Sequence, residues 1–323
     1  MIEFAKRADI DEIMRFIDME WRKNHILARD RAFFEYMYCI DDKVCFVISR
    51  EECNMSINGI LGFVAYDKKF HQISLSVWKA LSSTDGMVGL GMLNYLLNQL
   101  KPKKIATPGI NPKTTIALYK LMKFETGKMD HFYRLAKTES YKLALVSDGV
   151  IRKVENNSKS KITPINTFNE YCELNIEYSD NALAKEGWYI RKRYFEHPVY
   201  TYKVFLVSEE SRKLAIFLRE QQANDAKCIR IVDLIGDYDL LKNTTDFFDD
   251  ILNENGYEYI DCYVTGIDKE IFALSGWENC EENDSIIPNY FSPFEKTKVD
   301  LYYSSKPQGI VMLRGDSDQD RPN

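Results

Sequence analysis

A glycine-spaced turn between a predicted strand and a predicted helix is the part of the sequence best suited to bind an anion. Gly86, Gly89 and Gly91 lie within residues 82–100, SSTDGMVGLGMLNYLLNQL. Glycine leaves the backbone bare, and the first amides of a helix converge with the helix dipole on one point. This pattern suits the binding of a pyrophosphate. The alternative is that the glycines only make a tight turn and let helix and sheet pack closely.

The elements around this turn alternate between strands and helices. Alternating apolar residues predict a strand over 72–81, and apolar residues at helical spacing predict a helix over 93–100. The same criteria predict further strands at 1–7, 43–50, 59–66, 104–110, 124–129 and 131–136, and helices at 9–24, 28–40 and 111–124. This order predicts an α/β (α+β) fold, a mixed, mostly antiparallel twisted sheet with helices on both faces.

The second half of the chain repeats this order without repeating a residue string. It contains a predicted hairpin at 203–220, a strand and helix at 228–255, a strand and short helix at 257–277, and a last strand at 298–305. We therefore predict two copies of one fold, at 1–148 and 167–305. A polar linker at 149–166 joins them, and a solvated polar tail follows at 306–323.

Composition excludes several classes of function. The chain has 323 residues with 43 Lys and Arg against 49 Asp and Glu, a net charge of −6, and no basic stripe for nucleic acid. Its seven cysteines form no C-x-x-C pair and its four histidines are far apart, which predicts reduced thiols and no metal site. No apolar run is long enough to span a membrane, and the first residues lack a signal peptide's apolar core. We expect a cytoplasmic protein that binds neither nucleic acid nor membrane.

Two motifs resemble those of the GNAT acyltransferase superfamily, which uses acetyl-CoA or another acyl-CoA. In that family Q/R-x-x-G-x-G/A holds the CoA pyrophosphate, and a later helix carries N-x-x-[AS]-x-x-L-Y-x-x-x-G-F. Here the first stands at 86–91, with Gly86 in place of Gln or Arg. The second stands at 111–124, with Asn111 one residue further from Tyr119 than usual and Lys123 in place of glycine. The resemblance covers residues 1 to about 140.

The resemblance implies a role for each matched residue. It implies that CoA is bound by Val77, Trp78, Met87, Val88, Gly89, Leu90, Gly91 and Asn111. In this scheme the helix start holds the pyrophosphate, and the strand end at 77–78 pairs with the pantetheine arm together with Asn111. The resemblance also implies that Tyr119 acts as general acid and protonates the departing thiolate. The alternative interpretation is that Tyr119 only packs within an amphipathic helix.

The general base is assigned less directly. The resemblance places His25 at the acceptor cleft, with His71, Asp130 and His131 as alternatives. The second half lacks the glycine turn, because Gly236 stands alone and is followed by acids at 237 and 239 that would repel phosphate. We therefore expect CoA in the first half only and no metal ion.

A looser resemblance concerns the acceptor. Residues 288–295 and 315–323 resemble features of proteins encoded with bacterial surface-polysaccharide enzymes, such as those for the O-antigen of lipopolysaccharide. This implies acyl transfer to the amine of a nucleotide-linked amino sugar, with the tail gripping a sugar or docking on a second subunit of a homo-oligomer. The alternatives are an aminoacyl transferase that uses charged tRNA and a non-catalytic sugar-binding or assembly protein.

Overall fold

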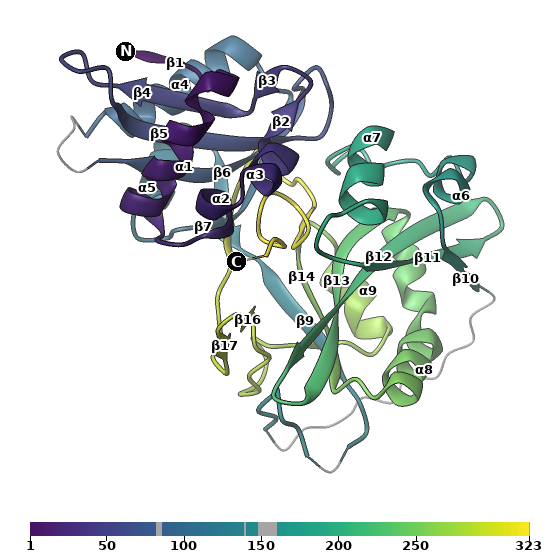
Figure 1. Cartoon of the computed structure of the whole chain (residues 1–323). Helices are drawn as coiled ribbons and strands as arrows, with labels where there is room; N and C mark the ends of the chain where they lie inside the picture. The colour runs from purple at the N-terminus through teal and green to yellow at the C-terminus, as the bar shows by residue number, and fades with distance from the viewer. Residues whose placement is uncertain (82–85, 139, 148–159, 323) are drawn as a thin grey trace.

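The protein contains two large sheets, each covered by helices on both faces, in a computed structural model that describes residues 1–81, 86–138, 140–147 and 160–322. Figure 1 shows the first sheet above the second, with the C-terminus near the centre between them. This confirms the predicted fold class. In the described part of the chain, no helix has the length and apolar character needed to cross a membrane.

The first sheet is mixed and has one parallel pair. Its strands, in spatial order, are β1 (Ile2–Phe4), β4 (Phe46–Arg50), β5 (Ile57–Ala65), β6 (Gln72–Ala80), β7 (Lys104–Ile110), β18 (Tyr302–Lys306) and β8 (Glu125–Lys128). All neighbours are antiparallel except β6 and β7. A two-stranded hairpin of β2 (Cys39–Ile40) and β3 (Lys43–Val44) lies beside it.

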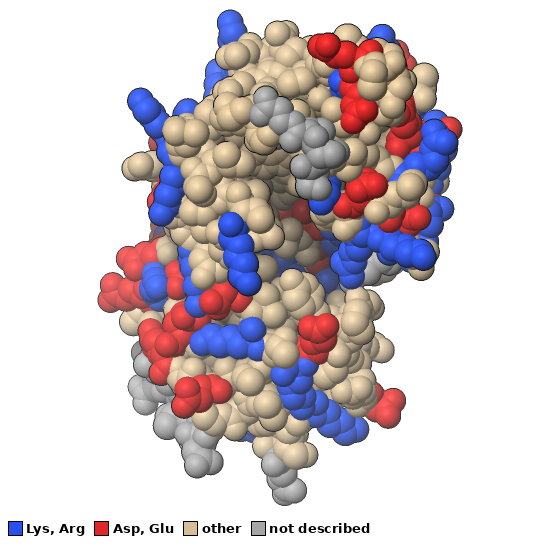
Figure 2. Space-filling view, turned by 90° about the vertical axis from the view of Figure 1, so that its left-hand side faces the viewer, with Lys and Arg blue, Asp and Glu red and all other residues tan. Residues whose placement is uncertain are grey.

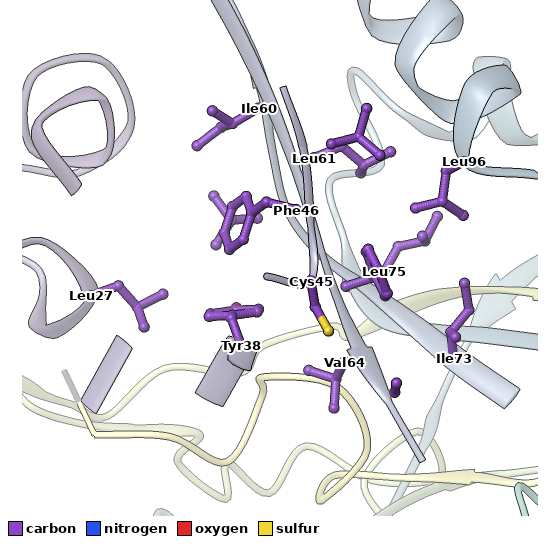
Figure 3. Packing of buried hydrophobic residues seen from close by; sticks show 14 of the residues in the cluster. Leu27, Tyr38, Cys45, Phe46, Ile60, Leu61, Val64, Ile73, Leu75 and Leu96 are labelled. Carbon is purple, nitrogen blue, oxygen red and sulfur yellow. The ribbon is translucent and has the colours of Figure 1, made fainter. Parts of the chain in front are cut away.

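Helices cover both faces of this sheet because its central strands are apolar on both sides. One face is covered by a 3₁₀ turn (Arg7–Asp9), α1 (Ile10–Phe16), a π-helix (Ile17–Trp21), α2 (Ile26–Arg29) and α3 (Arg31–Tyr38), and the other by α4 (Val88–Leu100). A short α5 (Ile116–Leu121) follows β7. Figure 3 shows Leu27 of α2 on one side of the strands and Leu96 of α4 on the other.

The second sheet repeats this construction. Its strands are β10 (Lys161–Ile165), β11 (Tyr202–Glu209), β12 (Arg212–Ala223), β13 (Ala226–Gly236), β14 (Tyr259–Thr265), β9 (Asp130–Leu135) and β15 (Glu278–Asn279), with β19 (Met312–Leu313) also on β14. Again one pair, β13 and β14, is parallel. A small hairpin joins β16 (Tyr290–Phe291) to β17 (Phe294–Glu295).

Side chains alternate along β12 between two helical layers. Ile216 packs with α8 (Thr245–Asn255) and α9 (Lys269–Leu274), whereas Phe217 packs with α6 (Phe168–Glu173) and a π-helix (Arg191–Phe195) that continues α7 (Gly187–Ile190). A 3₁₀ helix (Tyr238–Asn243) precedes α8. Both halves therefore contain a π-helix before their main strands, in keeping with two copies of one fold.

The two halves exchange strands, which the sequence analysis did not predict. We expected 131–136 to close the first sheet and 298–305 to close the second. Instead β9 pairs with β14 of the second sheet, and β18 lies between β7 and β8 of the first. Figure 1 shows the blue β9 arrow among the green strands of the second sheet. Local periodicity identifies a strand but not its partner, because pairing is decided by contacts distant in sequence.

The predicted linker and tail also differ from expectation. Residues 149–159 of the predicted linker lie outside the described residues, but 161–165 form β10 and pair with β11. The predicted solvated tail is largely buried, with Asp316, Ser317, Asp318 and Asp320 each below 7% exposure. We call residues 310–322 the C-terminal segment. Its charges are buried because partners from both halves pair with them, as described below.

Candidate active site

The candidate site is the gap where the two parallel strands of the first sheet part. β6 and β7 are paired only at Gln72–Lys104 and Ile73–Ile105, and then diverge. Their separated ends line a cleft of about 610 Å³, together with α5 and the start of α4. Figure 2 shows a deep hollow on this side of the molecule, between its two halves, with acidic side chains inside and Lys and Arg on the rim. The gap exposes strand edges that a ligand amide can pair with.

The start of α4 faces this cleft through its glycines. Gly86 and Gly89 line the cleft, and a Cβ on Gly89 would lie 3.4 Å from the Trp78 indole nitrogen. The first amides of α4, from Val88 to Leu90, have no partner within the helix, which makes this end suitable for an anion. The predicted role of Gly91 is wrong, because its amide donates to the Met87 carbonyl at 2.8 Å. Residues 82–85 of the predicted turn lie outside the described residues.

The other predicted cofactor residues also gather at the cleft. Val77 and Trp78 line it from β6, and Asn111 lines it from the end of β7. The Asn111 side-chain oxygen accepts the Lys113 amide at 2.9 Å, which shapes the turn into α5. The side-chain amino group of Asn111 could donate to a ligand in the cleft.

Tyr119 lies at the inner end of the cleft, on α5. It is 2% exposed, and its ring packs edge-on against Trp78 at 5.6 Å and against Phe124 at 5.3 Å. Burial raises the pKa of Tyr119, and the neighbouring Ser304 and Thr107 hydroxyls lower it by less. The phenol is therefore protonated at neutral pH, which is the form that a proton donor requires.

Four residues of this site come from the second half of the sequence. The exchanged strand β18 brings Ser304 to Tyr119, and the C-terminal segment brings Asp318, Gln319 and Arg321 to the cleft lining. Ser304 was not predicted to lie at the site, and the tail at 315–323 was given only the looser role of gripping a sugar or docking on a second subunit. The signal available was the apolar run 310–313 (IVML), which predicts that the chain just before the charged end is buried.

The geometry weighs against the predicted base role of His25. His25 is 2% exposed and does not line the cleft. Its Nδ1 faces the Leu27 amide at 3.2 Å and its Nε2 faces the Arg321 Nε at 3.3 Å, so both ring nitrogens face N–H groups. Burial, followed by the charge of Arg321, lowers the pKa of His25 to about 3. The histidine caps α2 and contacts the C-terminal segment, which is a structural role.

Replacing His25 by Asn makes the protein less sensitive to acid. The unfolded pKa of about 6.5 exceeds the folded value of about 3, so unfolding takes up a proton below pH 6.5 and stability falls as the pH drops. His25 contributes up to about 2 kcal/mol of this loss between pH 7 and pH 5. Because Asn can still cap α2, denaturant titrations at both pH values should show a smaller loss for His25→Asn. An equal loss in both proteins would contradict this assignment.

The alternative bases lie away from the cleft. His131 of β9 is buried in the second sheet, where its Nε2 lies 3.1 Å from Asp261 and its Nδ1 lies 3.4 Å from the Cys280 sulfur. Asp130 pairs with Lys269 at 2.6 Å, and His71 does not line the cleft. The described residues contain no cluster of His, Cys, Asp and Glu arranged to hold a metal ion.

The corresponding gap in the second sheet is filled by the chain itself. β13 and β14 part after Ile231 and Cys262. Beyond this point β19 pairs with β14, and the Gly315 amide donates to the Val232 carbonyl at 2.6 Å. A Cβ on Gly315 would lie 2.5 Å from that oxygen, so only glycine fits. The C-terminal segment therefore occupies the place in the second half where the first half has its cleft.

Comparison with solved structures identifies the fold. No protein-family model matches the sequence, and no curated protein is significantly similar to it. A GCN5-related N-acetyltransferase from Anabaena variabilis is similar with a TM-score of 0.57 and 10% identity, over 94% of this chain and 72% of that one. A probable N-acyltransferase from Enterococcus faecalis is similar with a TM-score of 0.56 and 9% identity, over 94% and 71%. The chain therefore has the fold of these two structures over 94% of its length.

Proposed function

We propose that the protein is an N-acyltransferase that moves an acyl group from acyl-CoA to an amine. The observation that carries this proposal is the convergence of three features on one cleft. These are the start of α4, the edge of β6 at Val77 and Trp78, which is not paired with β7, and Tyr119. A CoA thioester requires three such features in this order along its length. They are an anion-binding helix end for the pyrophosphate, a strand edge for the amides of the pantetheine arm, and a proton donor for the sulfur.

In the proposed reaction, the neutral acceptor amine attacks the thioester carbonyl, its nitrogen gives up a proton to water in the cleft, the carbon–sulfur bond breaks, and the thiolate leaves. Tyr119 donates its proton to that sulfur. The pyrophosphate lies at the amides of Val88 and Gly89, and the pantetheine arm pairs with Val77 and Trp78. The cleft holds both reactants in one orientation, which lowers the entropic part of the barrier.

The acceptor enters beside the C-terminal segment. Asp318, Arg321 and Trp21 line this part of the cleft, and Arg321 lies over the Trp21 ring at 5.5 Å from its centroid. Asp318 is paired with Arg321, so the wall carries both charges. The acceptor that the looser sequence resemblance implies is a nucleotide-linked amino sugar, and it stays a proposal.

Mass spectrometry of products tests this function. The protein is incubated with acetyl-CoA and a panel of amines that includes nucleotide-linked amino sugars, amino acids and polyamines. We expect a mass increase of one acetyl group on an amine and release of free CoA. Release of CoA without any acylated amine in the panel would contradict transfer to these acceptor classes. If the protein binds acetyl-CoA but neither releases CoA nor acylates an amine, it is a non-catalytic binding protein.

Restoring a side-chain donor at position 86 should strengthen CoA binding. Gly86 is exposed and a Cβ there would meet nothing within 4 Å, so a long side chain fits. In Gly86→Arg the guanidinium can reach the pyrophosphate, and a charge-assisted hydrogen bond of about 1.5 kcal/mol corresponds to roughly tenfold tighter binding. Calorimetric titration with CoA measures this affinity. Gly86→Glu is the matched control and should weaken binding; equal affinities for both variants would contradict a pyrophosphate at this helix end.

A further inference from the structure

The C-terminal segment reaches the inner end of the cleft and is held there from both halves. The Ser317 hydroxyl donates to the Leu75 carbonyl at 2.7 Å, and its amide donates to the Tyr66 hydroxyl at 2.8 Å. Asp316 pairs with Lys185 at 3.0 Å. The segment therefore seals the edge of β6 at Leu75, just beyond the last strand pair of β6 with β7.

Gln319 is the side chain of this segment that faces β7. Its amide group lies so close to Gly109 that a Cβ there would be 2.1 Å from the Gln319 side-chain carbon. Gly109 also has a positive φ of 81°, so the strand needs glycine at this point. The Gln319 amino group donates to Asp318 at 3.1 Å, which fixes the side chain between the strand and the rest of the segment.

Gln319 is one step along β7 from the hydroxyl of Tyr119. Thr107 and Gly109 lie two residues apart on β7, and both line the cleft together with Gln319, although Gly109 itself interrupts the pairing of β7 with β18. The Thr107 hydroxyl accepts the Leu75 amide at 3.3 Å and lies near enough to the Tyr119 hydroxyl to lower the pKa of Tyr119. Two residues of strand span about 7 Å. If the thioester sulfur lies at Tyr119, Gln319 is within an acyl chain's length of it.

We infer that Gln319 closes the acyl end of the cleft and restricts the protein to short acyl groups such as acetyl. This inference rests on the proposed function, because it assumes that acyl-CoA binds in the cleft. An acetyl group fits between Tyr119 and Gln319, whereas a longer chain meets the Gln319 side chain. Gln319 can move aside only by breaking its bond to Asp318 or by shifting the segment that Ser317 and Asp316 fix.

Calorimetric binding of acetyl-CoA and hexanoyl-CoA tests the inference without a known acceptor. We expect the wild-type protein to bind acetyl-CoA at least tenfold more tightly than hexanoyl-CoA, since steric differences of a few methylenes commonly have this size. Gln319→Ala should bring the two affinities within about threefold. Gln319→Met, which keeps the length of the side chain, should retain the preference, and Gln222→Ala is the same change at an exposed residue outside the cleft.

The outcomes separate this inference from the proposed function. Equal wild-type affinities, or a preference that Gln319→Ala leaves unchanged, would overturn the role of Gln319 while acyl-CoA binding stands. No binding of either thioester by the wild-type protein would overturn the proposed function itself. Circular dichroism tests whether Gln319→Ala is folded. If it is not, the ratio of the two affinities in the wild-type protein and the same ratio in Gln319→Ser decide whether Gln319 restricts the acyl chain.

Discussion

Tyr119→Phe should lower kcat by at least about 100-fold while leaving the affinity for acetyl-CoA within about twofold of wild type. The phenylalanine keeps the ring contacts with Trp78 and Phe124 and removes only the hydroxyl. A positioned general acid contributes typically 10²–10⁴-fold, and the loss is confined to the step in which sulfur leaves. Steady-state rates with an acceptor found by mass spectrometry, together with calorimetry, measure the two quantities separately.

Tyr95→Phe is the matched control for this experiment. Tyr95 lies on α4, packs against Phe4 at 5.4 Å, and does not line the cleft. The Tyr95→Phe substitution should leave both kcat and the affinity for acetyl-CoA unchanged. If Tyr119→Phe retains wild-type turnover, the phenol does not donate the proton, and its contacts with Thr107 and Ser304 are then structural.

Asp320→Ala should lower the free energy of unfolding by about 3–5 kcal/mol, because it leaves two buried guanidinium groups without their counter-charge. Asp320 is 1% exposed. It pairs with Arg219 at 2.6 Å and Arg193 at 3.2 Å, and accepts the Tyr202 hydroxyl at 2.8 Å. Burial raises the pKa of Asp320, but Arg219 and Arg193 outweigh it and hold that pKa below its usual range. Denaturant titration measures the loss.

Asp11→Ala is the matched control for this second variant. Asp11 pairs with Arg31, but the two side chains are 73% and 45% exposed. Exposed ion pairs contribute about 0–1 kcal/mol, so this substitution should change stability little. If Asp320→Ala is no more destabilising than Asp11→Ala, the C-terminal segment is not held by its buried charges.

The elements that form the cleft could be predicted because their signals are local. β6 begins with alternating Ile73, Leu75 and Val77, and α4 has a leucine stripe. Of the glycines predicted to form the turn, Gly86 precedes α4, whereas Gly89 and Gly91 lie within its first turn. The joint role of this turn and Tyr119 was implied by the resemblance of the two motifs to those of the GNAT superfamily. These predictions depend on residues that are close together in the sequence.

The buried C-terminal segment could not be predicted from its composition. Residues 314–323 (RGDSDQDRPN) are polar and charged, which is typical of a solvated tail. Asp320 is buried because it pairs with Arg219, a partner 101 residues away in the sequence. A single sequence does not show which distant charges meet. For the same reason the exchange of β9 and β18 was missed, although both strands were recognised as strands.

The stoichiometry of acetyl-CoA binding tests the central claim most directly. Calorimetric titration of the full chain should give one site per polypeptide, because the β6–β7 cleft is open and the C-terminal segment fills the β13–β14 gap. Two sites would show that the segment leaves the second gap, and no binding would show that the open cleft does not accept the thioester.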